Sequence, residues 1–567
     1  MAGRPRPNSE RLLRLGGQIL PWTLLALHAG LLLNSIRLHS VCTDEAAHIP
    51  SGLIHWHAGT YAAYRVNPPT PRMLATLPLL ATGCQWVDDE PEKYSDPFAR
   101  NELNIRKPFF DFNRTHYHDF VFLSRIAGVF WSCLGGILIF QWARELCGYR
   151  GAILSLVLWC FDPTILAYAQ IVTPDLPCAV AGLWAMYTFR RYLQNSVWPA
   201  AVFAGGVLGI ALLTKFTLLV LLPVCLVLLI VSPRIPDVST FRTWRVRAGH
   251  AALALVAMLL VVNLAYLFEG SGRRLGEIPF VSRMFAGPRA PLDPKRGAAG
   301  AAYPFRDTWL GSLPSPVPED WLRGIDVQRR DFEEFRNTRP SYLAGKWRDG
   351  GWWYYYVVAL AIKLPLGTIV LILAGMLAAM IRRRCSASWR EELAIYLPAL
   401  AIITLVSSQT GFNHHMRYVL PALPFLFVGT AKLGSLLNGG STSVARPESS
   451  KGVAGDPRPS KTQGVPPKLR RMVLDALIVG CVLWSTVSSL SFYPHSMSYF
   501  NEAVGGPENG HAYLVDSNID WGQDLFFLKR WLDQHPEARG LRTAVYNSPY
   551  IVRRVLEIEP LPPPSGL

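Results

Sequence analysis

The 567-residue chain is half hydrophobic and only 17% charged, whereas a soluble protein of this size carries about a quarter charged residues. Apolar runs long enough to cross a bilayer recur along it, so we predict an all-α, multi-pass integral membrane protein. The net charge of +16 lies mostly between these runs, where membrane topology explains it, and we expect no nucleic-acid partner. The nine cysteines include no CxxC pair, which argues against a zinc module or a disulfide scaffold.

About eleven transmembrane helices are predicted from the apolar runs. They are residues 17–36, 120–143, 151–171, a run ending at 189, 198–213, 216–231, 251–268, a run ending before 382, 393–408, a run ending near 437, and 472–491. With this count, the basic clusters all fall on one side of the membrane, which the positive-inside rule makes cytoplasmic. We therefore expect a protein of the cytoplasmic (plasma or inner) membrane whose N-terminus is inside and whose C-terminus is outside.

Four regions are predicted on this topology. Residues 1–437 form a transmembrane catalytic domain, with outer loops over 37–119 and 269–352. The first outer loop alternates aromatic, basic and short apolar stretches, which is typical of helices that lie in the membrane interface. Residues 438–470, rich in Gly, Ser and Pro, read as a disordered cytoplasmic linker. Residues 471–491 form the last transmembrane helix, and 492–567 a small extracytoplasmic tail.

Charged residues at the outer ends of the apolar runs are candidates for a functional site, because charge inside a membrane is costly. Asp44 and Glu45 follow the first run, Asp175 lies at the outer end of a hairpin, and Lys215 joins two short apolar helices. Arg125 and Arg417 each open a predicted span. Simpler alternatives remain for all of them: a solvated acidic pair, a helix cap at Asp175, or side chains that extend to lipid head groups.

Several short motifs occur in an order that resembles the membrane-embedded glycosyltransferases of the GT-C fold, closest to glycosyltransferase family 39, which includes protein O-mannosyltransferases and aminoarabinose transferases. The motifs are Asp44-Glu45, the turn at 67–72, Arg125, residues 173–177, 212–215, 351–355 and 417–424, and the tail stretches 499–502 and 516–524. The resemblance covers nearly the whole chain apart from the linker. It leaves the transferred sugar and the acceptor open.

The resemblance implies a polyprenyl-phosphate-linked sugar as donor and a glycan, lipid or protein as acceptor, with membrane lipids around the site. It assigns Asp44 as general base, Glu45 as its orienting partner, and Asp175 to acceptor binding or to ordering the catalytic loop. Cations are needed because the leaving group is a phosphate. The candidates are Lys215, Arg417, Arg125 and Arg72, and the candidate acceptor or sugar contacts are His414, His415 and Trp521.

A structural or catalytic divalent metal is a further option, since His48, His55 and His57 follow the acidic pair, but we favour histidines with ordinary partners and assign no metal ligands. Two rival functions remain. A transporter or lipid-linked sugar flippase also needs many helices and intramembrane charge, although no internal repeat is visible. An oligosaccharyltransferase is expected to carry Trp-Trp-Asp, whereas Trp352-Trp353 is followed here by Tyr354.

Overall fold

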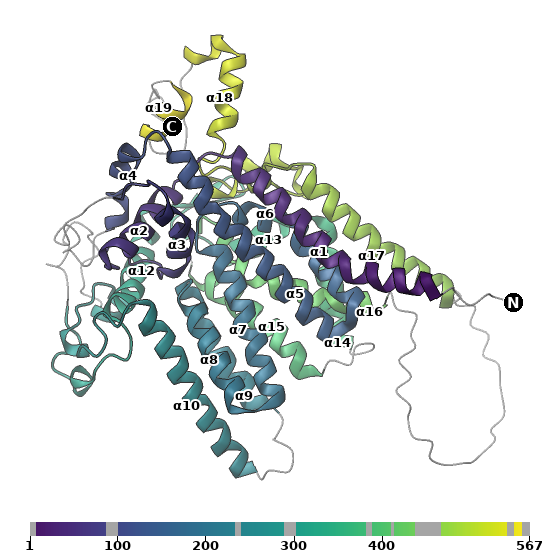
Figure 1. Cartoon of the computed structure of the whole chain (residues 1–567), viewed down its shortest axis with the longest axis horizontal. Helices are drawn as coiled ribbons and strands as arrows, with labels where there is room; N and C mark the ends of the chain where they lie inside the picture. Colours follow the sequence, from purple (N-terminus) through teal and green to yellow (C-terminus); the bar gives the residue numbers. More distant parts are fainter. Residues whose placement is uncertain are drawn as a thin grey trace.

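The computed structural model describes residues 7–86, 100–232, 240–287, 302–381, 388–409, 413–436, 467–540 and 549–557. Within these ranges the chain is mostly helical (Figure 1), which confirms the predicted all-α class. The named strands, β1 (Ser341–Leu343) and β2 (Lys346–Arg348), form one antiparallel hairpin. The predicted linker lies outside the described residues as far as residue 466.

Long helices form a central bundle, and shorter helices gather at one end of it (Figure 1). In chain order the α-helices are α1 (Pro7–Leu38), α2 (Glu45–Ala58), α3 (Thr70–Thr76), α4 (Arg106–Phe112), α5 (Tyr117–Phe161), α6 (Pro163–Ala169), α7 (Asp175–Asn195), α8 (Trp198–Leu212), α9 (Leu221–Val231), α10 (Thr240–Ala265), α11 (Arg283–Ala286), α12 (Glu319–Thr338), α13 (Tyr355–Lys363), α14 (Leu366–Ile381), α15 (Trp389–Ser408), α16 (Leu423–Leu436), α17 (Pro467–Leu490), α18 (Leu525–Gln534) and α19 (Pro549–Leu556).

Among the described residues, six helices are long and apolar enough to cross a membrane, or up to seven if the bent pair α13–α14 is one span. The short apolar helices predicted on either side of Lys215 are present as α8 and the run Phe216–Val231. A multi-pass membrane protein is therefore confirmed. The total of eleven spans stays a prediction.

The α5 run contains a chain reversal at Gly148, so it is a helical hairpin and not one straight helix. Gly148 has a φ of 74°, a left-handed conformation that glycine adopts without steric cost. The two halves touch: a Cβ on Gly135 would lie 2.5 Å from the Trp159 ring, and one on Gly136 would lie 3.2 Å from the Leu156 side chain. The predicted span 120–143 lies within the first half, whereas the predicted span 151–171 is divided at Asp162 into the second half of α5 and the short helix α6.

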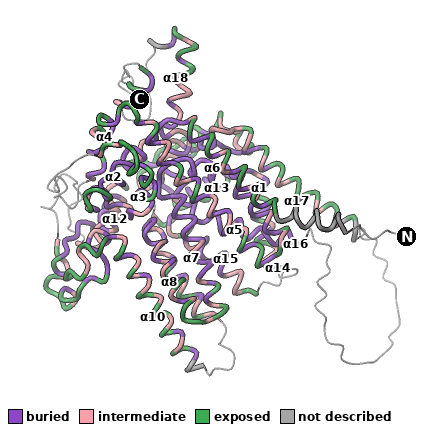
Figure 2. Tube along the Cα trace, in the orientation of Figure 1, coloured by how far each residue is buried: buried purple, intermediate pink, exposed green. Residues whose placement is uncertain are grey.

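The first outer loop forms the short helices α2, α3 and α4, as predicted, and α2 is largely buried (Figure 2). The segment between α2 and α3 contacts α12, which belongs to the second predicted outer loop. The Arg65 guanidinium binds the Asp320 carboxylate at 2.7 Å, and Gly324 packs against the carbonyl of Arg65. The segment around Arg65 and α12 thus pack against each other at one end of the bundle.

The tail seals the break between α13 and α14, which are bent by 118°. A helix that ends at such a break leaves carbonyl groups without partners. The Asn501 amide donates to the carbonyls of Ala361 (2.7 Å) and Leu364 (2.8 Å), and its backbone N–H donates to Ile362 (2.9 Å). The motif at 499–502 therefore has a structural role at this end of α13.

Lys363, the last residue of α13, also binds the tail. Its ammonium donates to the carbonyls of Met497 (2.8 Å) and Asn518 (2.7 Å) and lies 4.3 Å from the centre of the Phe500 ring. The first part of the tail, as far as Asn518, is consequently packed against the bundle.

Candidate active site

Four charged side chains from distant parts of the chain meet in one cluster. The Lys215 ammonium lies 2.6 Å from one Asp175 carboxylate oxygen, and Arg417 Nη1 lies 3.6 Å from the other. The same Arg417 nitrogen lies 3.2 Å from Asp44 Oδ2. The side chains of Asp175, Lys215 and Arg417 are 1%, 6% and 9% exposed, whereas that of Asp44 is 36% exposed. Asp44 is thus the carboxylate of this cluster that an incoming molecule can reach.

Each member of the cluster sits at a helix end. Asp44 is the residue before α2 and Asp175 is the first residue of α7, where the positive end of the helix dipole favours a carboxylate. Lys215 has an extended backbone between α8 and the 3₁₀ turn η4 (Phe216–Val220), and Arg417 lies in the turn η8 (Met416–Tyr418). Rigid elements therefore hold all four groups.

Aromatic rings support both cations. The Arg417 guanidinium lies 4.0 Å from the centre of the Trp521 ring, and the Lys215 ammonium lies 4.6 Å from that of Tyr418. Trp521 is only 2% exposed. Because Arg417 covers its ring, we infer that Trp521 orients this cation and does not stack on a sugar. Tyr418 was not among the predicted site residues, although it directly follows Arg417.

Glu45 faces away from Asp44 and is completely buried. It accepts hydrogen bonds from Arg125 Nε and Nη2 at 2.8 and 2.6 Å, and from the backbone N–H groups of Cys42 and Val172, both at 2.8 Å. The remaining N–H groups of Arg125 donate to the carbonyls of Ile36, His39 and Ser40. Since all five guanidinium N–H groups are used, we leave Arg125 out of the phosphate site and assign this pair to holding the loop before Asp44.

Arg72 likewise lies apart from the cluster of Asp44, Asp175, Lys215 and Arg417. Its Nε donates to His55 Nε2 at 2.9 Å, and its Nη2 donates to the Tyr64 carbonyl at 2.6 Å. His55 Nδ1 in turn donates to the Thr60 carbonyl at 2.7 Å, so both ring nitrogens have partners. These contacts fix the turn between α2 and α3, and we infer a structural role for Arg72.

The three histidines after the acidic pair each have other partners in the structure. His48 stacks on Tyr64 with ring centres 4.8 Å apart, whereas His57 stacks on Trp86 at 4.9 Å. Burial, followed by the nearby Arg72, Arg417, Lys215 and Arg100, holds the pKa of His48 well below its usual value. His48 is therefore a neutral group close to the charged cluster.

The tail supplies one wall of the site. His414 Nδ1 lies 3.5 Å from Asp516 Oδ2, and His415 Nδ1 is hydrogen-bonded to the Ser517 hydroxyl. Burial acts to raise the pKa of Asp516, but the hydrogen bond from His414 and the charge of His415 outweigh it and lower this pKa to about 2. An ionised Asp516 thus holds the His414–His415 segment that leads into Arg417.

Backbone hydrogen bonds join the tail to the segment that carries Asp44. Ser40 N–H donates to the Gln523 carbonyl at 2.8 Å, and Thr43 N–H donates to the Trp521 carbonyl at 3.1 Å. The Ser40 hydroxyl adds a bond of 2.6 Å to the Gly522 carbonyl. The position of Asp44 therefore depends on residues nearly 500 positions later. In the sequence, the acidic and amide-rich stretch 516–524 was the feature that indicated a role for the tail.

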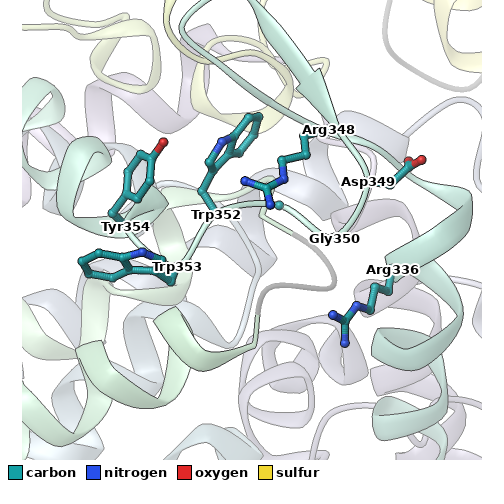
Figure 3. A pocket seen from close by; sticks show the side chains of 8 residues that line it. Arg336, Arg348, Asp349, Gly350, Trp352, Trp353 and Tyr354 are labelled. Carbon is teal, nitrogen blue, oxygen red and sulfur yellow. The ribbon is translucent and has the colours of Figure 1, made fainter.

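A cavity of about 500 Å³ lies between α12 and the loop that enters α13 (Figure 3). Arg336 and Arg348 line it, together with Trp352, Trp353 and Tyr354. The Trp352 N–H donates to the Asn413 side chain at 2.7 Å, next to His414 in sequence. None of the four charged residues of the cluster lines this cavity.

A family model for dolichyl-phosphate-mannose-protein mannosyltransferases matches residues 120–266, about a quarter of the chain. The matched segment contains Arg125, Asp175 and Lys215. No curated protein matches the chain in sequence.

Two solved structures illustrate the structural similarity. One is ArnT from Cupriavidus metallidurans bound to undecaprenyl phosphate, with 14% identity over 94% of this chain and 73% of that one, at a TM-score of 0.44. The other is the archaeal oligosaccharyltransferase AglB from Archaeoglobus fulgidus with an inhibitory peptide and a dolichol-phosphate, with 11% identity over 96% of this chain and 64% of that one, also at 0.44. The family match falls on the segment that carries three of the predicted motifs, and it supports a membrane glycosyltransferase of the GT-C class.

Proposed function

We propose that this enzyme transfers a sugar from a polyprenyl-phosphate-linked donor to an acceptor hydroxyl or phosphate on the outer face of the membrane, with Asp44 as the general base. The lipid-phosphate donor follows from the family match over residues 120–266. The outer face follows from the distribution of basic residues, which is the sequence evidence for topology.

The observation that carries this proposal is the asymmetry of the cluster. Asp44 is partly exposed beside Arg417, whereas Asp175 is buried between Lys215 and Arg417. A general base has to reach the acceptor hydroxyl, and a leaving phosphate needs fixed cations close to the reacting carbon. We therefore assign proton removal to Asp44 and phosphate binding to Lys215 and Arg417, while Asp175 keeps the two cations together.

The charges balance during such a transfer. Two cations and two carboxylates make the cluster neutral before reaction. When the acceptor oxygen bonds to the anomeric carbon and the bond from that carbon to the phosphate oxygen breaks, the hydroxyl proton passes to Asp44. The cluster then gains one positive charge as the lipid phosphodiester becomes a monoester with one more negative charge. The cations consequently bind the product phosphate more strongly than the donor, which favours the transition state.

The test compares Asp44→Asn with Asp119→Asn, which changes an exposed carboxylate in the first turn of α5. Each purified protein is given radiolabelled polyprenyl-phosphate sugars in detergent, and sugar moved to added acceptors is measured. Removing a positioned base lowers the rate about 10²–10⁴-fold, so Asp44→Asn should bind donor but transfer almost nothing, and Asp119→Asn should behave as wild type.

Wild-type transfer by Asp44→Asn would refute the assignment and make Asp175 the next candidate. A transporter or flippase would instead show no transfer in any variant, and a substrate flux across sealed vesicles.

A further inference from the structure

A second cluster, outside the proposed site, brings together His39, His495 and Asp524. His39 follows α1, His495 follows α17, and Asp524 precedes α18. One nitrogen or oxygen from each side chain lies within 4.8 Å of the other two. The distances to Asp524 Oδ1 are 3.5 Å from His39 Nε2 and 3.2 Å from His495 Nδ1.

His39 points an unshared electron pair into this cluster. Its Nδ1 lies 2.9 Å from the Ser35 carbonyl, which only an N–H can satisfy, so in the neutral ring Nε2 carries the lone pair. Nε2 is buried, on a side chain that is 1% exposed, and makes no hydrogen bond among the described residues. A buried lone pair that faces a carboxylate oxygen at 3.5 Å is unfavourable unless a cation lies between them.

We propose that His39, His495 and Asp524 bind one divalent transition-metal ion of the zinc type. Two imidazole nitrogens and a carboxylate oxygen are a common ligand set for Zn²⁺, whose bonds of about 2.0–2.1 Å place tetrahedral ligands roughly 3.3–3.4 Å apart. The two distances to Asp524, 3.5 and 3.2 Å, agree with that spacing, and the two histidine nitrogens lie within 4.8 Å of each other. Binding displaces the proton that His495 Nδ1 otherwise shares with Asp524, and solvent fills the fourth position.

The surroundings support the same ligands. The Ser35 carbonyl orients His39, and Gln523 Nε2 donates to the second Asp524 oxygen at 2.9 Å, which leaves Oδ1 for the metal. Such outer contacts are typical of metal-bound histidine and carboxylate groups. The Phe527 ring lies 5.4 Å from the His39 ring and 4.4 Å from the His495 ring, and it covers one side of the cluster.

The metal would connect the end of α1 to the tail. Gln523, the neighbour of Asp524, already accepts the Ser40 N–H. An ion on His39 would therefore hold this contact and, through it, the segment that ends at Asp44. We assign the metal a structural role that does not depend on the proposed transfer reaction.

The test uses the full chain in detergent, without an affinity tag, stripped with a chelator and then given Zn²⁺. Bound zinc is measured by elemental analysis after desalting, and the thermal unfolding midpoint is followed with and without zinc. We expect one equivalent of zinc and a higher midpoint. His495→Ala should lower zinc affinity by at least about tenfold and remove the midpoint shift. His495 is partly exposed, so its loss leaves the fold intact.

Asp524→Asn should weaken binding in the same way, because a neutral amide is a poorer ligand. His511→Ala, which removes an exposed histidine of the same tail, is the matched control and should bind as wild type. The proposal is overturned if the wild type binds no stoichiometric zinc, or if His495→Ala and Asp524→Asn bind zinc as tightly as the wild type.

Discussion

Replacing Glu45 by Gln should destabilise the protein strongly, although the neighbouring Asp44→Asn change should affect activity alone. Glu45 is fully buried and accepts four N–H groups, two of them from Arg125. Removing its charge leaves the Arg125 guanidinium buried beside a neutral amide whose NH₂ group faces N–H donors. Breaking a buried ion pair in this way costs about 3–5 kcal/mol. Asp44 is partly exposed with one ion-pair contact, and its loss should cost at most about 1 kcal/mol.

The measurement is unfolding by denaturant in mixed micelles, with donor binding assayed on the folded fraction. Arg125→Gln and the double variant Glu45→Gln/Arg125→Gln complete a cycle that isolates the pair. We expect the double variant to be less damaged than the sum of the single ones. The reasoning is refuted if Glu45→Gln unfolds as the wild type does, because the buried pair would then not stabilise the fold. A variant that is stable but inactive would point to a role of Glu45 in catalysis.

Three further predictions follow from other contacts. Lys215→Met should weaken binding of the lipid phosphate, measured by titration, whereas Arg417 should keep its ion pair with Asp175. The control Lys107→Met changes an exposed lysine and should have no effect on this binding. Burial, together with Asp524 and Asp516, raises the pKa of Asp520 from 3.8 to about 6. Ionisation of Asp520 therefore destabilises the folded state increasingly as the pH rises from about 3.8 to about 6, and fully above that. Asp520→Asn should consequently raise the unfolding midpoint more at pH 7.5 than at pH 5. Gly128→Ala should lower the midpoint, because its Cβ would lie 2.2 Å from a backbone oxygen, whereas Gly206→Ala has room and should not.

Much of this architecture could be predicted because hydropathy is local. The apolar runs on both sides of Lys215 are present as α8 and Phe216–Val231, and the first half of α5 contains the predicted span 120–143. The charges that meet with Asp44 could be anticipated for a related reason: an ionised group at the end of an apolar run needs a partner, and Lys215, Asp175 and Arg417 partner one another.

Contacts between distant segments could not be predicted. Adjacent carboxylates look alike in a sequence, yet Asp44 contacts Arg417 of the cluster whereas Glu45 is buried against Arg125. The start of α2 points the two side chains in different directions. Arg72 looked like a phosphate ligand, but its partners are carbonyls and His55. Trp521 looked suited to a sugar, and only the fold shows that Arg417 covers its ring.

The backbone bonds from Ser40 and Thr43 to the tail also have a consequence for biosynthesis. A ribosome makes the segment before Asp44 among the first residues and residues 521–523 among the last, so the nascent chain lacks one wall of its site until synthesis is nearly complete. Until the C-terminal residues are made, the segment before Asp44 lacks these backbone contacts. A chain that stops before residue 521 would contain every helix as far as α17 but lack these contacts, and we expect it to be inactive.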